Sequence, residues 1–253
     1  MRNFPPEIKI VGAMLVSRNT QLLDITIPSL LKYCDWVLIL LDNESDEAVQ
    51  IVEKYQREHY DKIWVRRSSA PHNIITRGGN IASYHDRWKG LKGTIRDDMF
   101  TNLKKITKNK GYDKIDILLW PDSDEIFTDY LPELLETFWK SDKKAITMRP
   151  VDVVGSMRAI KRESMSHHVH IMRYSEELVG LPWRFNALYY PLTREDLMVV
   201  SHYHVHLAFL NNESAEWRRK NWKTDNAQEC RLFQLEKDVC QLSPDEIYNI
   251  LKI

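Results

Sequence analysis

Cysteine and glycine are scarce in this chain of 253 residues, which contains 3 Cys and 8 Gly. The cysteines form no CxxC pair and no zinc-binding spacing, and a reduced, intracellular setting is the simplest interpretation. The glycines form no GxGxxG or Walker A loop, which argues against a dinucleotide site or a P-loop. HExxH and GxSxG are missing too, so the sequence carries no zincin or serine-hydrolase motif.

An excess of charge of one sign and long apolar runs are also missing. Lys+Arg and Asp+Glu both total 36. The net charge of +0 excludes an overall positive charge of the kind that binds nucleic acid. No apolar run approaches the roughly 20 residues of a membrane span. The N-terminus has no signal-peptide pattern. We therefore expect a cytoplasmic protein without a stable membrane anchor.

Apolar segments alternate with amphipathic ones through the first half of the chain. Short β-compatible runs are followed by helical patterns, which predicts βαβ units. The runs are apolar enough for strands buried on both faces, so we expect an α/β fold with a central, mostly parallel sheet flanked by helices. The expected strands cover 8–16, 36–41, 63–65 and 115–120, and the expected helices cover 22–33, 46–59 and 80–110.

The second half of the chain has a different sequence pattern. Near the C-terminus, Ser243 and Glu246 form a capping box around Pro244, which predicts a short terminal helix. No repeat or low-complexity linker divides the chain, so we expect one domain over residues 1–253. Short strands separated by polar turns are expected at 145–148, 169–173, 185–190 and 198–207.

The most informative segment is Asp122-Ser123-Asp124-Glu125, which comes directly after an apolar strand. The carboxyl end of such a strand is where open α/β sheets bind ligands. Asp122 and Asp124 can face one hard cation, Mn²⁺ or Mg²⁺, which would also coordinate a diphosphate. The alternative is an acidic surface turn that caps a following helix.

Asp42 ends the second strand in the same way and could accept hydrogen bonds from a base or ribose. The alternative there is a turn with Ser45 or Asp46 as a helix cap. The stretch 217–223 is basic with interleaved aromatics and could wrap a diphosphate or a nucleic acid backbone, or it could be an amphipathic helix that buries Trp217. We expect charge-assisted bonds to phosphate from Arg87, Arg218 or Arg219.

Histidines at 202, 204 and 206 alternate along an expected strand, so their side chains should share one face. One or two of them could complete a metal shell or contact a phosphate, and we favour His204 or His206 as the metal ligand. The alternative is a polar strand face exposed to water. A further group, His167, His168 and His170, is expected in a solvated loop.

Together these motifs resemble the glycosyltransferases of the GT-A fold, in the family-2-like group. The resemblance covers about 8–210 and rests on Ser17-Arg18-Asn19, on 41–46, and on 120–127, which resembles the "DxDE-hydrophobic" metal motif of that family. It implies a nucleotide-diphospho-sugar transferase fold with a UDP- or GDP-sugar across the carboxyl edge of the sheet. It also implies that Asp42 holds the nucleotide, and that Asp122 and Asp124 hold Mn²⁺ or Mg²⁺ on the diphosphate, joined by a late histidine.

The resemblance also implies how the single domain is divided. Residues 1–127 would form the nucleotide-sugar-binding half, 128–210 the acceptor half, and 211–253 a C-terminal helical segment. The residues expected to bind the nucleotide-sugar are Ser17, Arg18, Asp42, Arg87, Asp122, Ser123 and Arg218.

Inverting members of this family use an Asp or Glu as the general base, often in an "xED" motif. Arg194-Glu195-Asp196 has those letters but lies unusually close to the histidines, and Glu177 and Asp152 are rivals. We expect metal-dependent transfer of a sugar to the hydroxyl of a glycan, a protein or another compound. Of the two stereochemical outcomes, we favour inversion of the anomeric configuration. Neutral charge disfavours lipid and nucleic acid acceptors but leaves both open. The alternatives are a metal-dependent phosphoesterase and a non-catalytic sugar- or nucleotide-binding module.

Overall fold

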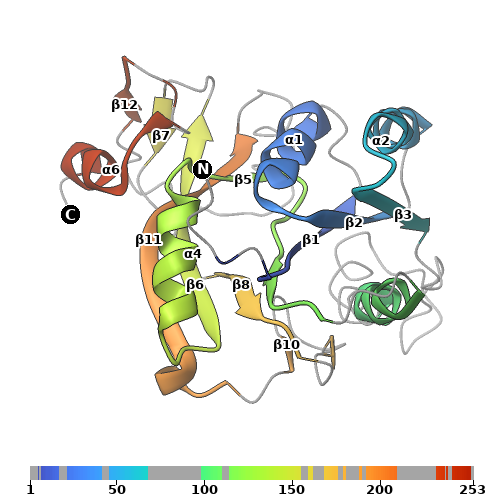
Figure 1. Cartoon of the computed structure of the whole chain (residues 1–253). Helices are drawn as coiled ribbons and strands as arrows, with labels where there is room; N and C mark the ends of the chain where they lie inside the picture. The colour runs from blue at the N-terminus through green and yellow to red at the C-terminus, as the bar shows by residue number, and fades with distance from the viewer. Residues whose placement is uncertain are drawn as a thin grey trace, which may run out of the picture.

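The structure, a computed structural model, describes most of the chain (Figure 1). The described residues are Pro5, 7–16, 22–41, 46–67, 98–109, 114–154, 159–161, 168–175, 179–180, 188–189, 192–209, 232–236, Asp238 and 241–251.

Four strands of the first half form a parallel sheet in the order β3-β2-β1-β4. All residues of β1 and β2 are buried, as expected for parallel strands covered on both faces. The strands are β1 (Ile10–Val16), β2 (Trp36–Leu41), β3 (Ile63–Arg67) and β4 (Ile117–Leu119).

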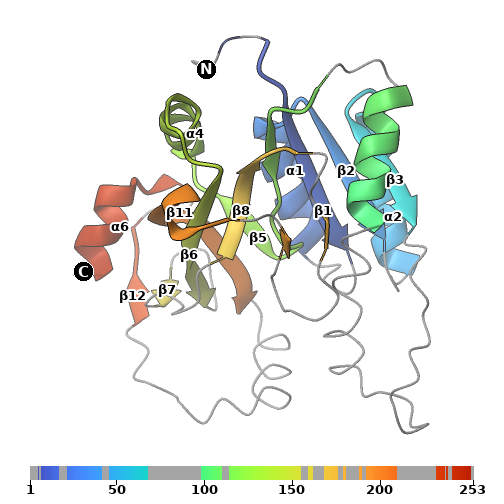
Figure 2. The same cartoon turned by 90° about the horizontal axis from the view of Figure 1, so that it is seen from below.

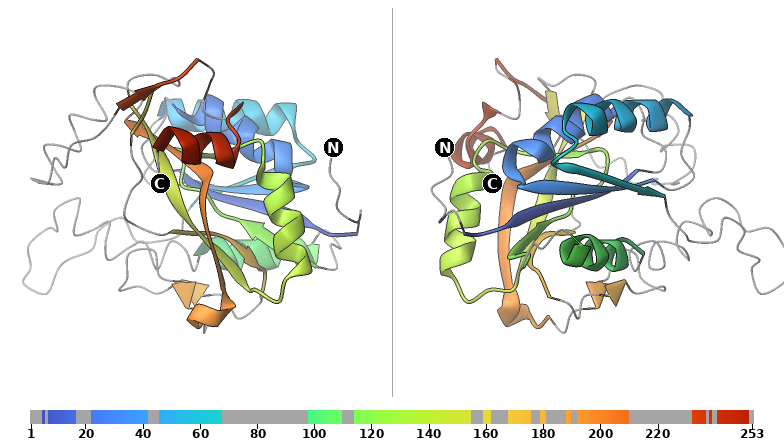
Figure 3. Two further views of the ribbon diagram at one scale, coloured as in Figure 1. Left: turned by 90° about the vertical axis from the view of Figure 1, so that its left-hand side faces the viewer. Right: turned by 45° about the vertical axis from the view of Figure 1, so that its right-hand side comes forward.

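Helices cover both faces of this sheet (Figure 3). Helices α1 (Leu23–Tyr33) and α2 (Asp46–Glu58) pack on one face together with α4 (Leu131–Lys140), and the helix over 98–109 packs on the other. Residue 12 is a glycine because α1 lies against β1 there: a Cβ atom at Gly12 would come within 2.9 Å of the Leu30 side chain.

The second half adds a strand system of mixed direction, in which β6 (Ala145–Val154) is central. Strands β8 (His168–Arg173) and β7 (Ala159–Lys161) pair antiparallel with β6, and β8 also pairs antiparallel with β4. Along its other side β6 runs parallel to β11 (Leu197–Phe209). The outer strands are β5 (Glu125–Phe127), antiparallel to β11, and β12 (Leu232–Gln234), antiparallel to β7.

The expected α/β fold with a helix-flanked central sheet is confirmed, but the sheet is mixed and curled, so the expectation of a mostly parallel sheet was wrong for the second half. The reason lies in the connections. From β6 to β7 the chain is too short for a crossover helix, so these two strands pair antiparallel, and β8, which runs in the same direction as β7, is also antiparallel to β6.

Three smaller features complete the described fold. Helix α6 (Pro244–Leu251) starts at the predicted capping box, with the Glu246 N–H donating to Ser243 Oγ at 3.1 Å. The segment 211–253 is not all helical, because it contains β12. A separate two-stranded sheet joins β9 (Val179–Gly180) to β10 (Leu188–Tyr189), and a 3₁₀ turn, η2 (Arg194–Asp196), precedes β11.

Among the described residues, no helix has the length and apolar character to cross a membrane.

Candidate metal centre

The acidic segment lies where the sequence predicted, at the carboxyl ends of the parallel strands. The chain leaves β4, and Asp122 then bridges to Leu15 near the end of β1. Two residues later, the backbone carbonyl of Asp124 accepts a 2.7 Å hydrogen bond from the Leu207 N–H of β11. The turn is therefore held between the parallel strands on one side and β11 on the other (Figure 2).

Hydrogen bonds within the turn fold the Glu125 side chain inward. The Asp122 N–H donates to Glu125 Oε2 at 2.7 Å, and the Glu125 N–H donates to the Asp122 carbonyl at 3.1 Å. As a result Glu125 is only 2% exposed. Its carboxylate points into the protein, unlike that of an acidic surface turn.

Strand alternation gathers the other polar side chains beside Glu125. His206 of β11 stands in register with Glu125 of β5 and with Asp152 of β6. The polar side chains share one face of these strands with Phe127, and the side chains of the other face are apolar because they pack against α6 and its neighbours. The apolar face consists of Ile126, Val151, Val153, Val205 and Leu207.

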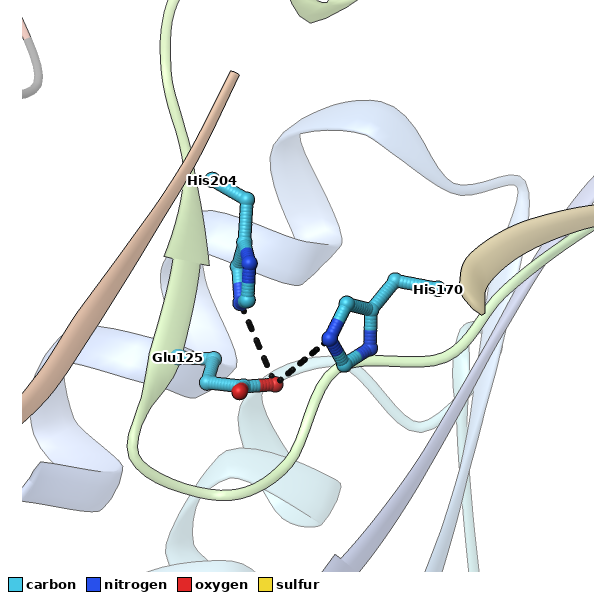
Figure 4. A group of neighbouring side chains, drawn as sticks. All are labelled: Glu125, His170 and His204. Atoms are coloured by element: carbon cyan, nitrogen blue, oxygen red, sulfur yellow. Dashed lines mark ion pairs between the residues drawn. The ribbon is translucent and has the colours of Figure 1, made fainter. Parts of the chain in front are cut away.

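We call Glu125, His170 and His204 the buried group (Figure 4). Glu125 Oε2 lies 3.2 Å from His204 Nε2 and 3.5 Å from His170 Nε2, and these three side chains are between 0% and 6% exposed. Among the residues that the structure describes, neither ring nitrogen of His204 makes a hydrogen bond. Two imidazole nitrogens and a carboxylate oxygen converge here on one point.

The tautomer of His170 is fixed by its neighbour. His170 Nδ1 lies 2.8 Å from the Trp120 carbonyl, which can only accept, so Nδ1 carries the proton. Burial lowers the pKa of His170 to about 4, although Glu125 opposes this, and the ring is neutral near pH 7. Its Nε2 lone pair therefore faces the Glu125 carboxylate.

Glu125 itself stays ionised. Burial alone would raise its pKa, but His170 and His204 outweigh that effect and hold the pKa well below its usual range. Because His170 Nε2 carries a lone pair and no proton, it cannot donate a hydrogen bond to this carboxylate. Both are electron-pair donors of the kind that bind a cation between them.

We call Asp124, Glu125 and His206 the outer group, because the His206 side chain is 16% exposed. His206 Nε2 lies 3.6 Å from Asp124 Oδ2, and its Nδ1 lies 2.8 Å from Asp152 Oδ1. Burial would lower the pKa of His206, but Asp124 and Asp152 raise it to about 10. In the absence of a metal, the ring therefore holds protons on both nitrogens.

Both groups could hold a metal ion, since the ligand atoms of each lie within 4.8 Å of one another. Glu125 belongs to both. Carboxylate with imidazole is a donor set that divalent transition metals accept, and a histidine whose second nitrogen donates to a carboxylate or carbonyl is typical of metal ligands. His206 with Asp152, and His170 with the Trp120 carbonyl, both have this arrangement.

The structure brings together several residues that the sequence singled out. Asp124, His204, His206 and Asp152 meet in or beside the two groups. Asp122 and the buried Ser123 lie in the same turn, but Asp122 belongs to neither group. Seven predicted site residues lie outside the described residues: Ser17, Arg18, Asp42, Arg87, Glu177, Arg218 and Arg219.

Asp196 is not brought to this site. It accepts hydrogen bonds from the Thr193 N–H and hydroxyl, which cap η2, and it pairs with Lys144 at 3.0 Å. It precedes β11, whose residues Leu197 and His206 are in register with Ala145 and Asp152 of β6. Those two residues of β6 are seven positions apart, which at 3.2–3.4 Å per residue places Asp196 more than about 20 Å from His206.

Sequence reasoning missed two members of the buried group. The expectation that His170 lies in a solvated loop was wrong, because it is 5% exposed on β8 between strands β4 and β6. The signal was its place inside the apolar strand Val169–Met172. Glu125 was expected only as part of the acidic motif, and its burial was not foreseen.

The sequence matches no protein-family model, and it matches no curated protein significantly. Among solved structures, TarS (1–349) of S. aureus aligns over 79% of this chain and 61% of its own, at 16% identity and a TM-score of 0.45. 4-Diphosphocytidyl-2C-methyl-D-erythritol synthase of Anaerococcus prevotii aligns over 86% and 97%, at 11% identity and a TM-score of 0.41.

UDP-glucose pyrophosphorylase of Leishmania major, solved with UDP-glucose, aligns over 65% of this chain and 43% of its own, at 8% identity and a TM-score of 0.36. The chain thus spans less than two thirds of the TarS fragment and of the pyrophosphorylase. With each TM-score below 0.5, these likenesses say nothing about what this chain binds or catalyses.

Proposed function

We propose that this chain is a metal-dependent glycosyltransferase, which moves a sugar from a nucleoside-diphosphate sugar to an acceptor hydroxyl. The observation that carries the proposal is the outer group, two carboxylates and one imidazole at the carboxyl edge of the parallel strands. Open α/β sheets bind ligands at that edge. The donor set suits Mn²⁺ or Mg²⁺, which prefer oxygen ligands, and the imidazole favours Mn²⁺ of the two.

The residues of the outer group fit such a cation. When bound, it would neutralise the charge that develops on the departing nucleoside diphosphate. Asp152 holds the proton on His206 Nδ1, so that Nε2 is the nitrogen presented beside Asp124. We assign Asp152 this positioning role, and we place Asp122, in the same turn, toward the same cation.

The topology supports the proposed nucleotide site. Leu41, the last residue of β2, is in register with Val16, and the preceding Leu15 bridges to Asp122. β1 and β2 therefore end at the edge of the sheet where the acidic turn lies. This supports Asp42 as the contact to the base or ribose of a UDP- or GDP-sugar, with Ser17, Arg18, Ser123, Arg87 and Arg218 as further donor contacts.

The proposed reaction leans to inversion, in which a carboxylate takes the proton of the acceptor hydroxyl. Asp152 is engaged with His206, and Asp196 is engaged in η2 far from the outer group. Glu177 is therefore our candidate for the base. The acceptor is a glycan, a protein or another hydroxyl compound, and the anomeric configuration of the product distinguishes inversion from retention.

A thermal-shift panel of nucleoside diphosphates and nucleotide-sugars, with and without Mn²⁺, tests the proposal, because a ligand of the native state raises the melting temperature. We expect a Mn²⁺-dependent shift that Asp124→Asn abolishes. Asp129→Asn is the matched control, since that side chain is 50% exposed and pairs with Lys32. If no nucleotide shifts the parent protein with Mn²⁺, the proposal is wrong.

A second candidate is a metal-dependent phosphoesterase. It is favoured by one observation: Glu125 belongs to both metal-capable groups, as a carboxylate shared by two catalytic cations would. Hydrolysis of model phosphate esters without any sugar donor would support it. Nucleotide binding without turnover across donors and acceptors would instead support a non-catalytic binding module.

A further inference from the structure

Two members of the buried group, His170 and His204, have no role in the proposed transfer reaction. The side chains of the group are at most 6% exposed, so a diphosphate has no access to them. A polar cluster this deep in a protein needs partners for its nitrogens and oxygens, since an unmet buried polar group is costly. Yet both ring nitrogens of His204 are buried without a hydrogen bond among the described residues, and its Nε2 is aimed at Glu125.

The distances in this group match those between two ligands of one metal ion. Zinc binds imidazole nitrogen and carboxylate oxygen at about 2.0–2.2 Å, so two ligands of a tetrahedral ion lie about 3.3–3.5 Å apart. Glu125 Oε2 lies 3.2 Å from His204 Nε2 and 3.5 Å from His170 Nε2. The rings of the two histidines also approach each other, with centroids 4.3 Å apart.

The atoms are also in the right chemical state. His170 Nδ1 donates to the Trp120 carbonyl, which leaves Nε2 as the ligand atom and fixes the ring. The ligand set of two imidazoles and one carboxylate is one that zinc uses, whereas Mg²⁺ rarely accepts imidazole. A fourth donor, such as water, would complete a tetrahedral shell.

We infer that Glu125, His170 and His204 form a second, buried site for one transition-metal ion of the Zn²⁺ class, distinct from the Mn²⁺ or Mg²⁺ site of the outer group. The ion ties together β5, β8 and β11, which are far apart in the sequence. Because Glu125 also belongs to the outer group, filling the buried site holds in place a carboxylate that both sites share. The inference stands whether or not the chain transfers sugar.

Zinc content after equilibrium dialysis of the full chain against Zn²⁺, in the presence of excess Mg²⁺, tests the inference. We expect one tightly held Zn²⁺ per chain, with a loss of affinity of more than about tenfold in His204→Gln and in His170→Gln. His206→Gln should keep this ion while losing Mn²⁺-dependent nucleotide binding. His59→Gln, in the turn between α2 and β3, is the matched histidine control and should change neither.

Buried variants can fail to fold, so a second measurement uses the parent protein alone. Crystals soaked in Zn²⁺ should show an anomalous peak at the zinc edge within bonding distance of Glu125, His170 and His204. A folded parent without that peak, or folded His204→Gln and His170→Gln variants that retain the tight Zn²⁺, would overturn the inference. Either result would leave the nucleotide test of the outer group unaffected.

Discussion

His206 donates its Nδ1–H to Asp152 Oδ1 over 2.8 Å, and the two residues stand opposite each other in register on the parallel strands β11 and β6. Asp152 is 5% exposed and cannot exchange this partner for water. The bond therefore determines which nitrogen of His206 is turned toward Asp124. The pairing of β6 with β11 thus determines which imidazole nitrogen the outer group presents to a metal ion.

Removing this bond should weaken metal binding without removing a ligand. Asp152→Ala leaves His206 free to rotate and to change tautomer, and we expect a loss of Mn²⁺ affinity of about 10–100-fold, measured by titration with electron paramagnetic resonance. Asp152→Asn keeps an acceptor oxygen and should lose less. The control is Asp142→Asn, whose side chain is 90% exposed. Equal affinity in all three variants and the parent would remove the positioning role.

The metal-free protein should lose stability as the pH rises above neutrality. Asp124 and Asp152 raise the pKa of His206 to about 10 from its ordinary 6.5, so protonated His206 stabilises the fold fully below pH 6.5. That contribution is lost progressively between about pH 6.5 and 10. Urea unfolding in EDTA should show the decline, and His206→Gln should flatten it. An identical decline in that variant would mean that another group is responsible.

Acidification should destabilise the metal-free protein through the buried group. Burial lowers the pKa of His170 to about 4, so the fold holds it neutral while the unfolded chain binds a proton below pH 6.5. Stability is therefore complete above pH 6.5 and falls as the pH drops toward 4. Saturating Zn²⁺ should shift the midpoint of acid unfolding to lower pH. A midpoint unchanged by Zn²⁺ would mean that no ligand of the ion titrates there.

Asp42→Ala should weaken nucleotide binding whether or not metal is present, because the proposed contact is to the base or ribose. A hydrogen bond to a charged group contributes roughly 1.5–3 kcal/mol, so the Kd of the free nucleoside diphosphate should rise by about 10–150-fold. Isothermal titration calorimetry in EDTA measures this. An unchanged Kd would show that the carboxylate does not touch the nucleotide.

Glu177→Gln and Asp196→Asn separate two candidates for the general base. We expect Glu177→Gln to lower kcat by about 10²–10⁴-fold with little change in donor binding. Asp196→Asn should leave kcat unchanged and lower the melting temperature, since its carboxylate caps η2. The reverse pattern, with kcat lost only in Asp196→Asn, would contradict the distance between η2 and the outer group.

Local patterns were enough to place part of the site. The apolar run before Asp122 indicated a buried strand, and the edge of the sheet followed from the parallel βαβ pattern. The two-residue period likewise placed His204 and His206 together, and Val205 and Leu207 are on the opposite, apolar face. These inferences held because they depend on neighbours within a few residues.

Other parts of the site depend on pairings that no local pattern reveals. His170 reaches the turn because Ile171 of β8 pairs with Leu119 of β4, about fifty residues earlier in the chain. Burial of Glu125 results from a hydrogen bond to the Asp122 N–H, which the letters of the motif do not specify. The mixed direction of the sheet likewise follows from how β6, β7 and β8 associate.

The alternation along β11 sets a limit on how this chain can change in length. Its pairing with β6 shifts register between Ser201 and Val205, a stretch that contains His204 and directly precedes His206. A one-residue deletion there would turn His204 and His206 toward α6 and bring Val205 to the metal groups, because side chains alternate at every position. A two-residue deletion would return the histidine side chains to the face of β11 that carries the metal groups. In this stretch we therefore expect the protein to tolerate deletion of an even number of residues but not of an odd number. The turn before β11 should tolerate both kinds of deletion.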